Sequence, residues 1–272
     1  MHPPSIDTEY PISPPCFRCA TCHSDRTGDG LQNALIHQEL PQAEIWLGEG
    51  GGTGCSEGPA THQMASNEAV DMYWWLDALG STAVHGHQRF LRETLAGGWY
   101  GLTNLTSMQV YPDYYAALLF SRLMGPIVLS ADVAQTPKPA PSSPIRAYAH
   151  CHRTKGLSIL LINLGTTANV TLADHLGRSL LPVQDISLSD DGIGSQYEVY
   201  RLAPPAAAAG GQTSHSVQLN GQILELGVNG ALPRLLGESA LQLTVYRGNS
   251  LLFASLTILK HVSIACDVLQ MG

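Results

Sequence analysis

Apolar side chains in the first half of the chain alternate between short β-like runs and stretches with helical spacing. Residues 44–48 predict a strand, and residues 64–79 carry apolar side chains at the spacing of a helix. Residues 88–95 predict a second strand, and a second helix is expected to begin at Asp113 and to stop before Gly125. This strand–helix–strand–helix order is typical of two consecutive units of a (β/α) barrel.

The pattern changes after a proline-rich stretch at residues 134–144, which we interpret as a semi-rigid surface connection. Several short β runs with turn residues between them then follow, and this pattern indicates a β-sandwich. Asn220-Gly221 between apolar runs predicts a two-residue hairpin turn. The expected strands and the hairpin lie at residues 146–151, 157–164, 195–202, 217–226 and 241–265.

Three parts are expected along the chain. Residues 1–40 predict an irregular or disordered segment, residues 41–133 a partial (β/α) barrel, and residues 145–272 a β-sandwich with some strands from flanking segments. A complete eight-stranded barrel takes about 200–250 residues, so about two barrel units are expected here. Two such units leave strand edges unpaired and helix faces uncovered, and we expect them to be less stable than the sandwich.

Composition and charge argue against some classes of binding partner. The 272 residues carry a formal net charge of −8, with 14 Lys and Arg and no basic cluster, which argues against nucleic acid and against a strongly sulfated substrate. No run of 18 apolar residues predicts a transmembrane span. The first residues lack the basic and apolar regions of a signal peptide. Neither a cofactor nor a specific oligomeric state is predicted.

Glu49 is the leading candidate for chemistry. It ends the first β-like run and is followed at once by Gly50 and Gly51. Residues at the C-terminal ends of barrel strands face the active-site mouth, and glycines let the backbone approach a ligand closely. The alternative is an ordinary solvated loop carboxylate.

Several longer motifs follow one another along the chain. They are WLGEGG (46–51), WLDALG (75–80), RETLAGGWYGL (92–102), PDYYAALL (112–119), RLMG (122–125), RAYAHC (146–151), LLINL (160–164) and VQLNGQ (217–222). In this order the motifs resemble glycoside hydrolase family 79, the heparanase and heparanase-like group, with plant-type members most similar. The resemblance runs from about Ile45 to Cys266.

The resemblance implies roles for several residues. The glutamate that ends this strand is the catalytic nucleophile of the family, and here it is Glu49. A tyrosine at the place of Tyr100, after Gly98, contacts the carboxylate of the sugar. The loop that contains Gly54 and Cys55 lacks the tyrosine of the family but keeps backbone N–H groups able to bind a carboxylate.

Two positions depart from the family. Glu93 stands where the family usually has glutamine, and a carboxylate there would repel a uronate or form a second carboxylate in the pocket. Retaining glycosidases need two carboxyl groups, and the acid/base of the family follows an asparagine on an earlier strand. The Asn67-Glu68 pair lies after Glu49 in a helical pattern, so we expect an exposed helix residue and no acid/base in this chain.

The resulting hypothesis is a retaining glycosidase that cleaves β-linked glucuronic acid in glycans or small glucuronides. The chain as given is expected to be incomplete and inactive. The alternative is a non-catalytic carbohydrate-binding or structural β-sandwich module. Family members enter the secretory pathway, which implies an extracellular, cell-wall, lysosomal, vacuolar or membrane-associated location. The exact uronide and endo or exo action stay open.

Cysteines and sequons complete the candidates. The family implies a disulfide between Cys151 and Cys266, which would require an oxidising compartment. Asn104 and Asn169 begin glycosylation sequons. A cluster of three cysteines and one histidine fits c-type haem attachment or a zinc site, but a tail without metal function is favoured; it comprises Cys16, Cys19, Cys22 and His23. His85 and His87 share one face of a strand entry, where a solvated face is favoured over a metal site.

Overall fold

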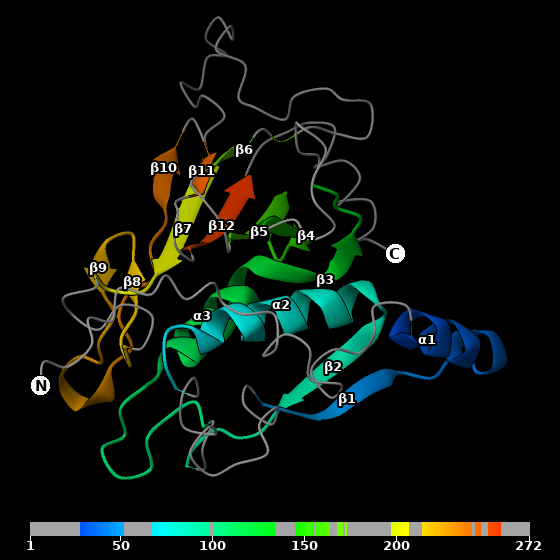
Figure 1. Ribbon diagram of the computed structural model, residues 1–272, viewed down its shortest axis with the longest axis horizontal. Coiled ribbons are helices and arrows are strands. Elements are labelled where there is room, and N and C mark those ends of the chain that lie inside the picture. The colour runs from blue at the N-terminus through cyan, green and yellow to red at the C-terminus, as the bar shows by residue number, and fades with distance from the viewer. Residues whose placement is uncertain are drawn as a thin grey trace, which may run out of the picture.

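The computed structural model describes eleven stretches of the chain, and the account that follows concerns these residues. They are 28–51, 67–97, 101–133, 145–154, 156–163, 168–170, 172, 197–206, 214–240, 243–245 and 250–256. Figure 1 shows two helices lying beside a large sheet, with a pair of short strands on the far side of the helices.

The first region is a β-α-β-α unit, as predicted. Strand β1 (Ile45–Gly50) pairs in parallel with β2 (His87–Arg92), and helix α2 (Asp71–Val84) connects them. Helix α3 (Pro112–Leu123) follows β2. Proline lies at the start of α3, where its missing N–H has no intrahelical partner in any case.

Helix α2 extends past the position where its end was expected. It continues through Gly80 to Val84. A Cβ atom at position 80 would overlap the ring of Tyr148 on the sheet. The glycine therefore serves close packing between helix and sheet instead of ending the helix.

The N-terminal segment also differs from the prediction. Helix α1 (Gly28–Glu39) lies inside the part expected to be irregular, residues 1–40, so that expectation is wrong for residues 28–39. Asn33 is buried, and its Nδ2 donates a hydrogen bond to the His85 carbonyl at 2.6 Å. A tertiary anchor of this kind has no signature in local sequence periodicity.

The second region is an antiparallel sheet in the order β3-β4-β5-β12-β7-β8-β9, with β10 also paired to β7. Two further strands, β6 and β11, pair with each other. The strand and 3₁₀-helix bounds are β3 (Met124–Leu129), β4 (Ile145–His152), β5 (Leu157–Asn163), β6 (Ala168–Val170), β7 (Tyr197–Ala203), β8 (Gln218–Leu219), β9 (Gln222–Ile223), η4 (Val228–Gly230), β10 (Glu238–Ala240), β11 (Leu243–Val245) and β12 (Ser250–Leu256).

The predicted hairpin is confirmed. Asn220 and Gly221, between β8 and β9, have φ angles of 50° and 81°. Positive φ at both central residues is the requirement of a type I′ turn, which Asn-Gly satisfies. The Asn220 side chain adds a bond, because its Oδ1 accepts from the Arg201 amide at 2.8 Å.

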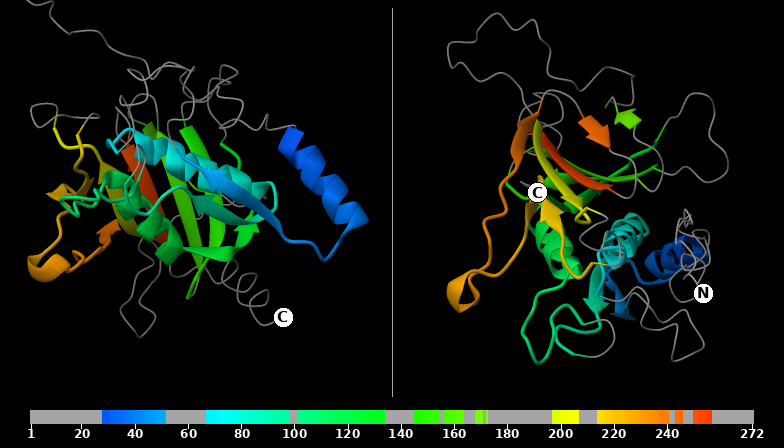
Figure 2. Two further views of the ribbon diagram at one scale, coloured as in Figure 1. Left: turned by 90° about the horizontal axis from the view of Figure 1, so that it is seen from below. Right: turned by 60° about the vertical axis from the view of Figure 1, so that its left-hand side comes forward.

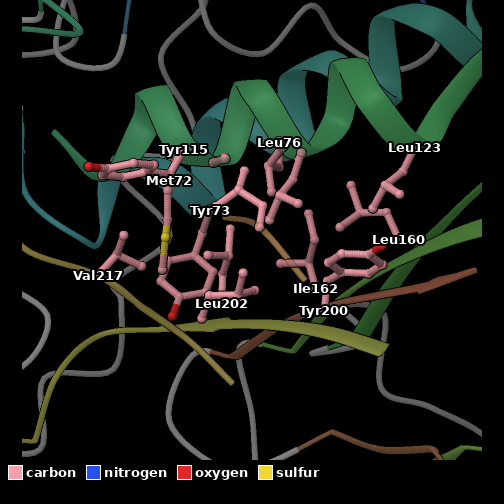
Figure 3. Close-up of a cluster of buried hydrophobic side chains, with 14 of the residues drawn as sticks. Met72, Tyr73, Leu76, Tyr115, Leu123, Leu160, Ile162, Tyr200, Leu202 and Val217 are labelled. Atoms are coloured by element: carbon pink, nitrogen blue, oxygen red, sulfur yellow. The ribbon is translucent and has the colours of Figure 1, made fainter. Parts of the chain in front are cut away.

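The two regions share one hydrophobic core, which contradicts the expectation that the helix faces would be uncovered. Helices α2 and α3 lie against one face of the large sheet (Figure 2). Figure 3 shows Leu76 of α2 among sheet residues such as Ile162 and Leu202. Asp77 of α2 also accepts a hydrogen bond from the Tyr148 hydroxyl at 2.6 Å and pairs with Arg146.

The boundary between the regions also differs from the expected one. Strand β3 lies within the predicted barrel part, residues 41–133, but it pairs with β4 as part of the large sheet. The Ser158 hydroxyl donates to the Leu123 carbonyl at 2.9 Å, so the sheet also bonds the end of α3. No helix in the described part of the chain is long and apolar enough to cross a membrane.

Candidate active site

The candidate carboxylates lie where β1 and β2 end. Gly50 is in register with Arg92, and the Glu93 amide donates to the Gly50 carbonyl at 3.0 Å. Because the strands are parallel, their C-terminal ends meet at the same edge of the sheet. The pairing therefore places Glu93 beside Glu49.

The Glu93 side chain lies close enough to Glu49 to raise the pKa of Glu49. The causes, largest first, are a side-chain hydrogen bond to Glu93, the like charge of Glu93 and burial. Glu49 itself is exposed, and Glu93 is half-buried. The structure thus brings together the two carboxylates that the sequence placed 44 positions apart.

A buried charge cluster lies next to this pair. The Arg92 side chain is 5% exposed and donates to Asp113 at 2.6 Å and to Asp71 at 3.2 Å. Its guanidinium also lies over the rings of Trp75 and Trp74, at 4.8 and 5.6 Å from their centroids. Cation–π contacts of this kind are favourable when the cation is desolvated.

The cluster ties two helix ends to the end of β2. Asp71 is the first residue of α2, and Asp113 lies in the first turn of α3. Carboxylates at helix N-termini interact favourably with the helix dipole. Burial, followed by the nearby Asp71 carboxylate, raises the pKa of Asp113 well above its ordinary value, although Arg92 opposes this shift. Asp113 is therefore harder to ionise than an exposed aspartate.

Glu68 is not the exposed helix residue that the sequence predicted. The Asn67-Glu68 pair lies in a turn before α2, with Asn67 at a φ of 68°, and Glu68 is half-buried. Burial, helped by the Asp71 charge, raises the pKa of Glu68 to about 7. The group whose side chain perturbs Glu49 is Glu93, however, and not Glu68.

Comparison with known proteins places the chain in a family. No family model matches it. Heparanase-like protein 1 of Arabidopsis thaliana is 34% identical over 222 residues, 75% of this chain and 38% of that protein. Baicalin-beta-D-glucuronidase of Scutellaria baicalensis is 33% identical over 208 residues, 76% of this chain and 34% of that protein. Heparanase of Bos taurus is 31% identical over 215 residues, 74% of this chain and 34% of that protein.

The chain belongs to the heparanase-like family, glycoside hydrolase family 79. It spans little more than a third of the length of these relatives. Among solved structures, the thermostable GH51 alpha-L-arabinofuranosidase of Thermotoga petrophila has a TM-score of 0.55 at 13% identity, over 86% of this chain and 48% of that chain. That likeness concerns the fold alone, which is of the α/β glycosidase type.

Several residues to which the heparanase-like resemblance assigns roles lie outside the described residues. These are Gly54, Cys55, Gly98, Tyr100 and Cys266, and the cluster of Cys16, Cys19, Cys22 and His23 also lies there. Their predicted roles stay predictions. Cys151 is fully buried and disulfide-bonded, while the five other cysteines all lie outside the described residues. The pairing of Cys151 with Cys266 is therefore still a prediction.

The remaining candidates have structural contacts. Asn104 Nδ2 donates to the Tyr111 hydroxyl at 3.0 Å. Asn169 lies in β6. The imidazole Nδ1 of His85 lies 2.7 Å from the Ser81 carbonyl, and that of His87 lies 3.2 Å from the Thr82 carbonyl. Both histidines therefore contact the C-terminal end of α2.

The sequence did not predict the Asp71–Arg92–Asp113 cluster. Acidic residues in the first turn of each helix were visible, and Arg92 and Asp113 lay in motifs shared with the family. Their convergence depends on how β2 and the two helices pack. Only an acidic residue at each helix start, combined with an arginine at a strand end, could have suggested it.

Proposed function

We propose that this chain carries the nucleophile-bearing part of a retaining glycoside hydrolase of the heparanase-like type, which acts on β-glucuronide linkages in glycans or small glucuronides. The position of Glu49 carries the proposal. It is exposed at the C-terminal end of a parallel strand, in a chain whose relatives are named heparanase and baicalin-beta-D-glucuronidase. Another relative is named hyaluronoglucuronidase.

In the proposed reaction, a Glu49 carboxylate oxygen attacks the anomeric carbon and forms a covalent glycosyl-enzyme. The bond to the leaving-group oxygen breaks, and that oxygen must receive a proton from a general acid. Water then attacks the anomeric carbon and gives its proton to the conjugate base of that acid, while the bond to Glu49 breaks and releases the carboxylate. We assign no general acid among the residues that the structure describes.

The same proposal covers the architecture and location. We assign β1-α2-β2-α3 to the last two units of a (β/α)₈ barrel and the large sheet to a C-terminal β-sandwich. The parallel pairing of β1 and β2 and the antiparallel order of the sheet support this assignment. The disulfide at Cys151 supports an oxidising compartment of the secretory pathway.

Labelling with an activated sugar tests the role of Glu49 without a general acid, since fluoride leaves readily. We expect 2-deoxy-2-fluoro-β-D-glucuronosyl fluoride to add one glycosyl group to the peptide that contains Glu49. Mass spectrometry of the digested chain measures it. Glu49→Gln should abolish the label, whereas Glu44→Gln, at a neighbouring exposed carboxylate, should keep it. No label, or a label on another residue, would contradict the assignment.

The chain alone should show no detectable turnover of an aryl β-glucuronide, because general acid–base help contributes roughly 10²–10⁴-fold. The release of nitrophenol by the purified chain measures this. Turnover that disappears in Glu49→Gln would show that an acid/base is present after all. Binding of a glucuronide without labelling of Glu49 would instead favour a carbohydrate-binding module.

A further inference from the structure

Gly50 directly follows the proposed nucleophile, and the ring of Phe90 occupies the space beside it. We propose that Gly50 and Phe90 form a positioning pair. The ring fills the place that a side chain would take at position 50, and it thereby fixes the peptide between Glu49 and Gly50. The pair holds the Glu49 carboxylate in the orientation that attack on the sugar requires, so the inference rests on the proposed role of Glu49.

The fit between the two residues is close. A Cβ atom at position 50 would lie 2.5 Å from Cε1 and 2.6 Å from Cζ of the Phe90 ring, which is shorter than an ordinary contact between carbon atoms. Gly50 is in register with Arg92, and Phe90 lies two residues before Arg92 on β2. A residue with a side chain at position 50 therefore leaves no room for the ring in its present place.

Trp75 of α2 also contacts the Phe90 ring and keeps it in place. The two rings meet edge to face, with centroids 4.8 Å apart and planes at 86°, which is a favourable arrangement of aromatic side chains. Trp75 is 3% exposed, and the Arg92 guanidinium lies over its ring. The contacts therefore run from the buried charge cluster through Trp75 and Phe90 to the residue that follows Glu49.

A glycine at the end of β1 needs this support. Glycine in a strand has no side chain to pack and allows the backbone more conformations, so it weakens the strand. An aromatic ring from a neighbouring strand that covers the glycine compensates for this loss. The backbone adds the bond from the Glu93 amide to the Gly50 carbonyl, at 3.0 Å. Because a displacement of about 1 Å can cost roughly 10²-fold in rate, the cover on Gly50 matters for attack by Glu49.

The rate at which 2-deoxy-2-fluoro-β-D-glucuronosyl fluoride labels the full chain, followed at several probe concentrations, tests the pair. Gly50→Ala should lower the maximal rate constant of labelling about tenfold or more, since the new methyl group displaces the ring or the peptide, and should change the half-saturating concentration little. A variant that only folds less well loses label at the end point but keeps the rate constant of its folded fraction. Gly48→Ala, where an added Cβ meets nothing within 4 Å, is the matched control and should label at the native rate.

An exchange of volume between the two positions separates the fit from other effects. Phe90→Leu alone should lower the rate constant less than Gly50→Ala does, since it uncovers the glycine without a clash. The double variant Gly50→Ala/Phe90→Leu keeps the total side-chain volume nearly constant, so it should recover most of the native rate constant. A native rate constant in Gly50→Ala, or no recovery in the double variant, would overturn the pair and leave the role of Glu49 in place. No label on the native chain would reject both.

Hydrogen exchange of the Glu93 amide checks the pair without a sugar. This amide donates to the Gly50 carbonyl, so loss of the cover on Gly50 should make it exchange faster in both single variants. Phe90→Leu keeps an apolar side chain and introduces no clash, so it decides the matter if Gly50→Ala does not fold. Native exchange together with native labelling in Phe90→Leu would contradict the proposal.

Discussion

The strands β1 and β2, which lead to the candidate carboxylates, are partly exposed, whereas the central strands of the large sheet are buried. Every residue of β5 is buried between its neighbours β4 and β12. In β1 and β2, by contrast, Trp46 is 54% exposed and Leu91 is 46% exposed. The comparison shows that the candidate site does not depend on burial of its own strands. The ion pairs of Arg92 tie the end of β2 to the first turns of α2 and α3 instead.

The largest effect should come from Arg92→Leu, which tests whether the buried cluster holds the exposed strands. The substitution leaves two buried carboxyl groups without their cation, and removal of one partner of a buried pair costs about 3–5 kcal/mol. The free energy of unfolding, from urea titration, measures this. Arg89→Leu, at an exposed position of the same strand, is the matched control. Equal losses of unfolding free energy in the two variants would show that the buried cluster does not hold the exposed strands.

Leu76→Ala tests whether the two regions are stabilised as one unit. Leu76 lies in α2 but is fully buried in the core shared with the sheet, and Leu→Ala substitutions in cores cost about 2–5 kcal/mol. Unfolding followed by tryptophan fluorescence, which reports on residues 46–99 where all four tryptophans lie, and by far-ultraviolet circular dichroism should shift together. Leu91→Ala should change little, since Leu91 is exposed. Two separate transitions would show that the regions unfold independently.

Gly221→Ala probes the sheet region at a position where the backbone sets the cost. Gly221 has a φ of 81° and no neighbouring atom within 4 Å of an added Cβ, so the penalty comes from conformation alone. We expect a loss of about 1–2 kcal/mol in the free energy of unfolding. Gly48→Ala in β1, where an added Cβ also meets nothing, should cost less. A larger loss of unfolding free energy in Gly48→Ala than in Gly221→Ala would contradict the assigned turn.

Asp113→Asn should have the smallest effect, but it should change the pH dependence. Because the folded protein raises the pKa of Asp113, this residue contributes stability at a pH below about 3.9, its unfolded value, and loses that contribution as the pH rises. We expect a cost of about 1 kcal/mol or less at pH 5, from an altered hydrogen bond. The difference in free energy of unfolding between the native protein and Asp113→Asn should be smaller at pH 8 than at pH 5.

Unfolding of both proteins between pH 5 and pH 8 measures this difference. Asp132→Asn, at an exposed carboxylate, should leave the pH dependence unchanged. A native advantage that grows with pH would mean that Asp113 is ionised in the folded protein at neutral pH.

The parts of the fold that depend on local patterns could be predicted from the sequence. Alternating runs of apolar residues placed β1 and β2, and the Asn220-Gly221 pair placed the hairpin, since these patterns act over a few neighbouring residues. Helix α1 was missed because Asn33 is anchored by the distant His85 carbonyl. The extent of α2 was missed because Gly80 fits under Tyr148, which lies on another element.

The candidate site likewise combines features that a local sequence pattern predicts with features that depend on contacts between distant elements. The position of Glu49 after a strand was visible in the chain, and the family resemblance supplied its role. The contact between Glu49 and Glu93 depends on the register of two parallel strands, which no local pattern sets. The half-buried turn that holds Glu68 was equally hidden, because its burial comes from packing and not from helical spacing.

The direct passage from α3 into β3 has a practical consequence for dividing the protein. Leu123 ends α3 and Met124 begins β3, so no linker separates the helix from the sheet. Cutting the chain between residues 133 and 145 would remove β3 from the margin of the sheet and leave the hydrogen-bonding groups of β4 open to other chains. Exposed strand margins promote intermolecular pairing. A fragment that starts at residue 145 should therefore self-associate, whereas one that keeps α3 and β3 should stay dispersed.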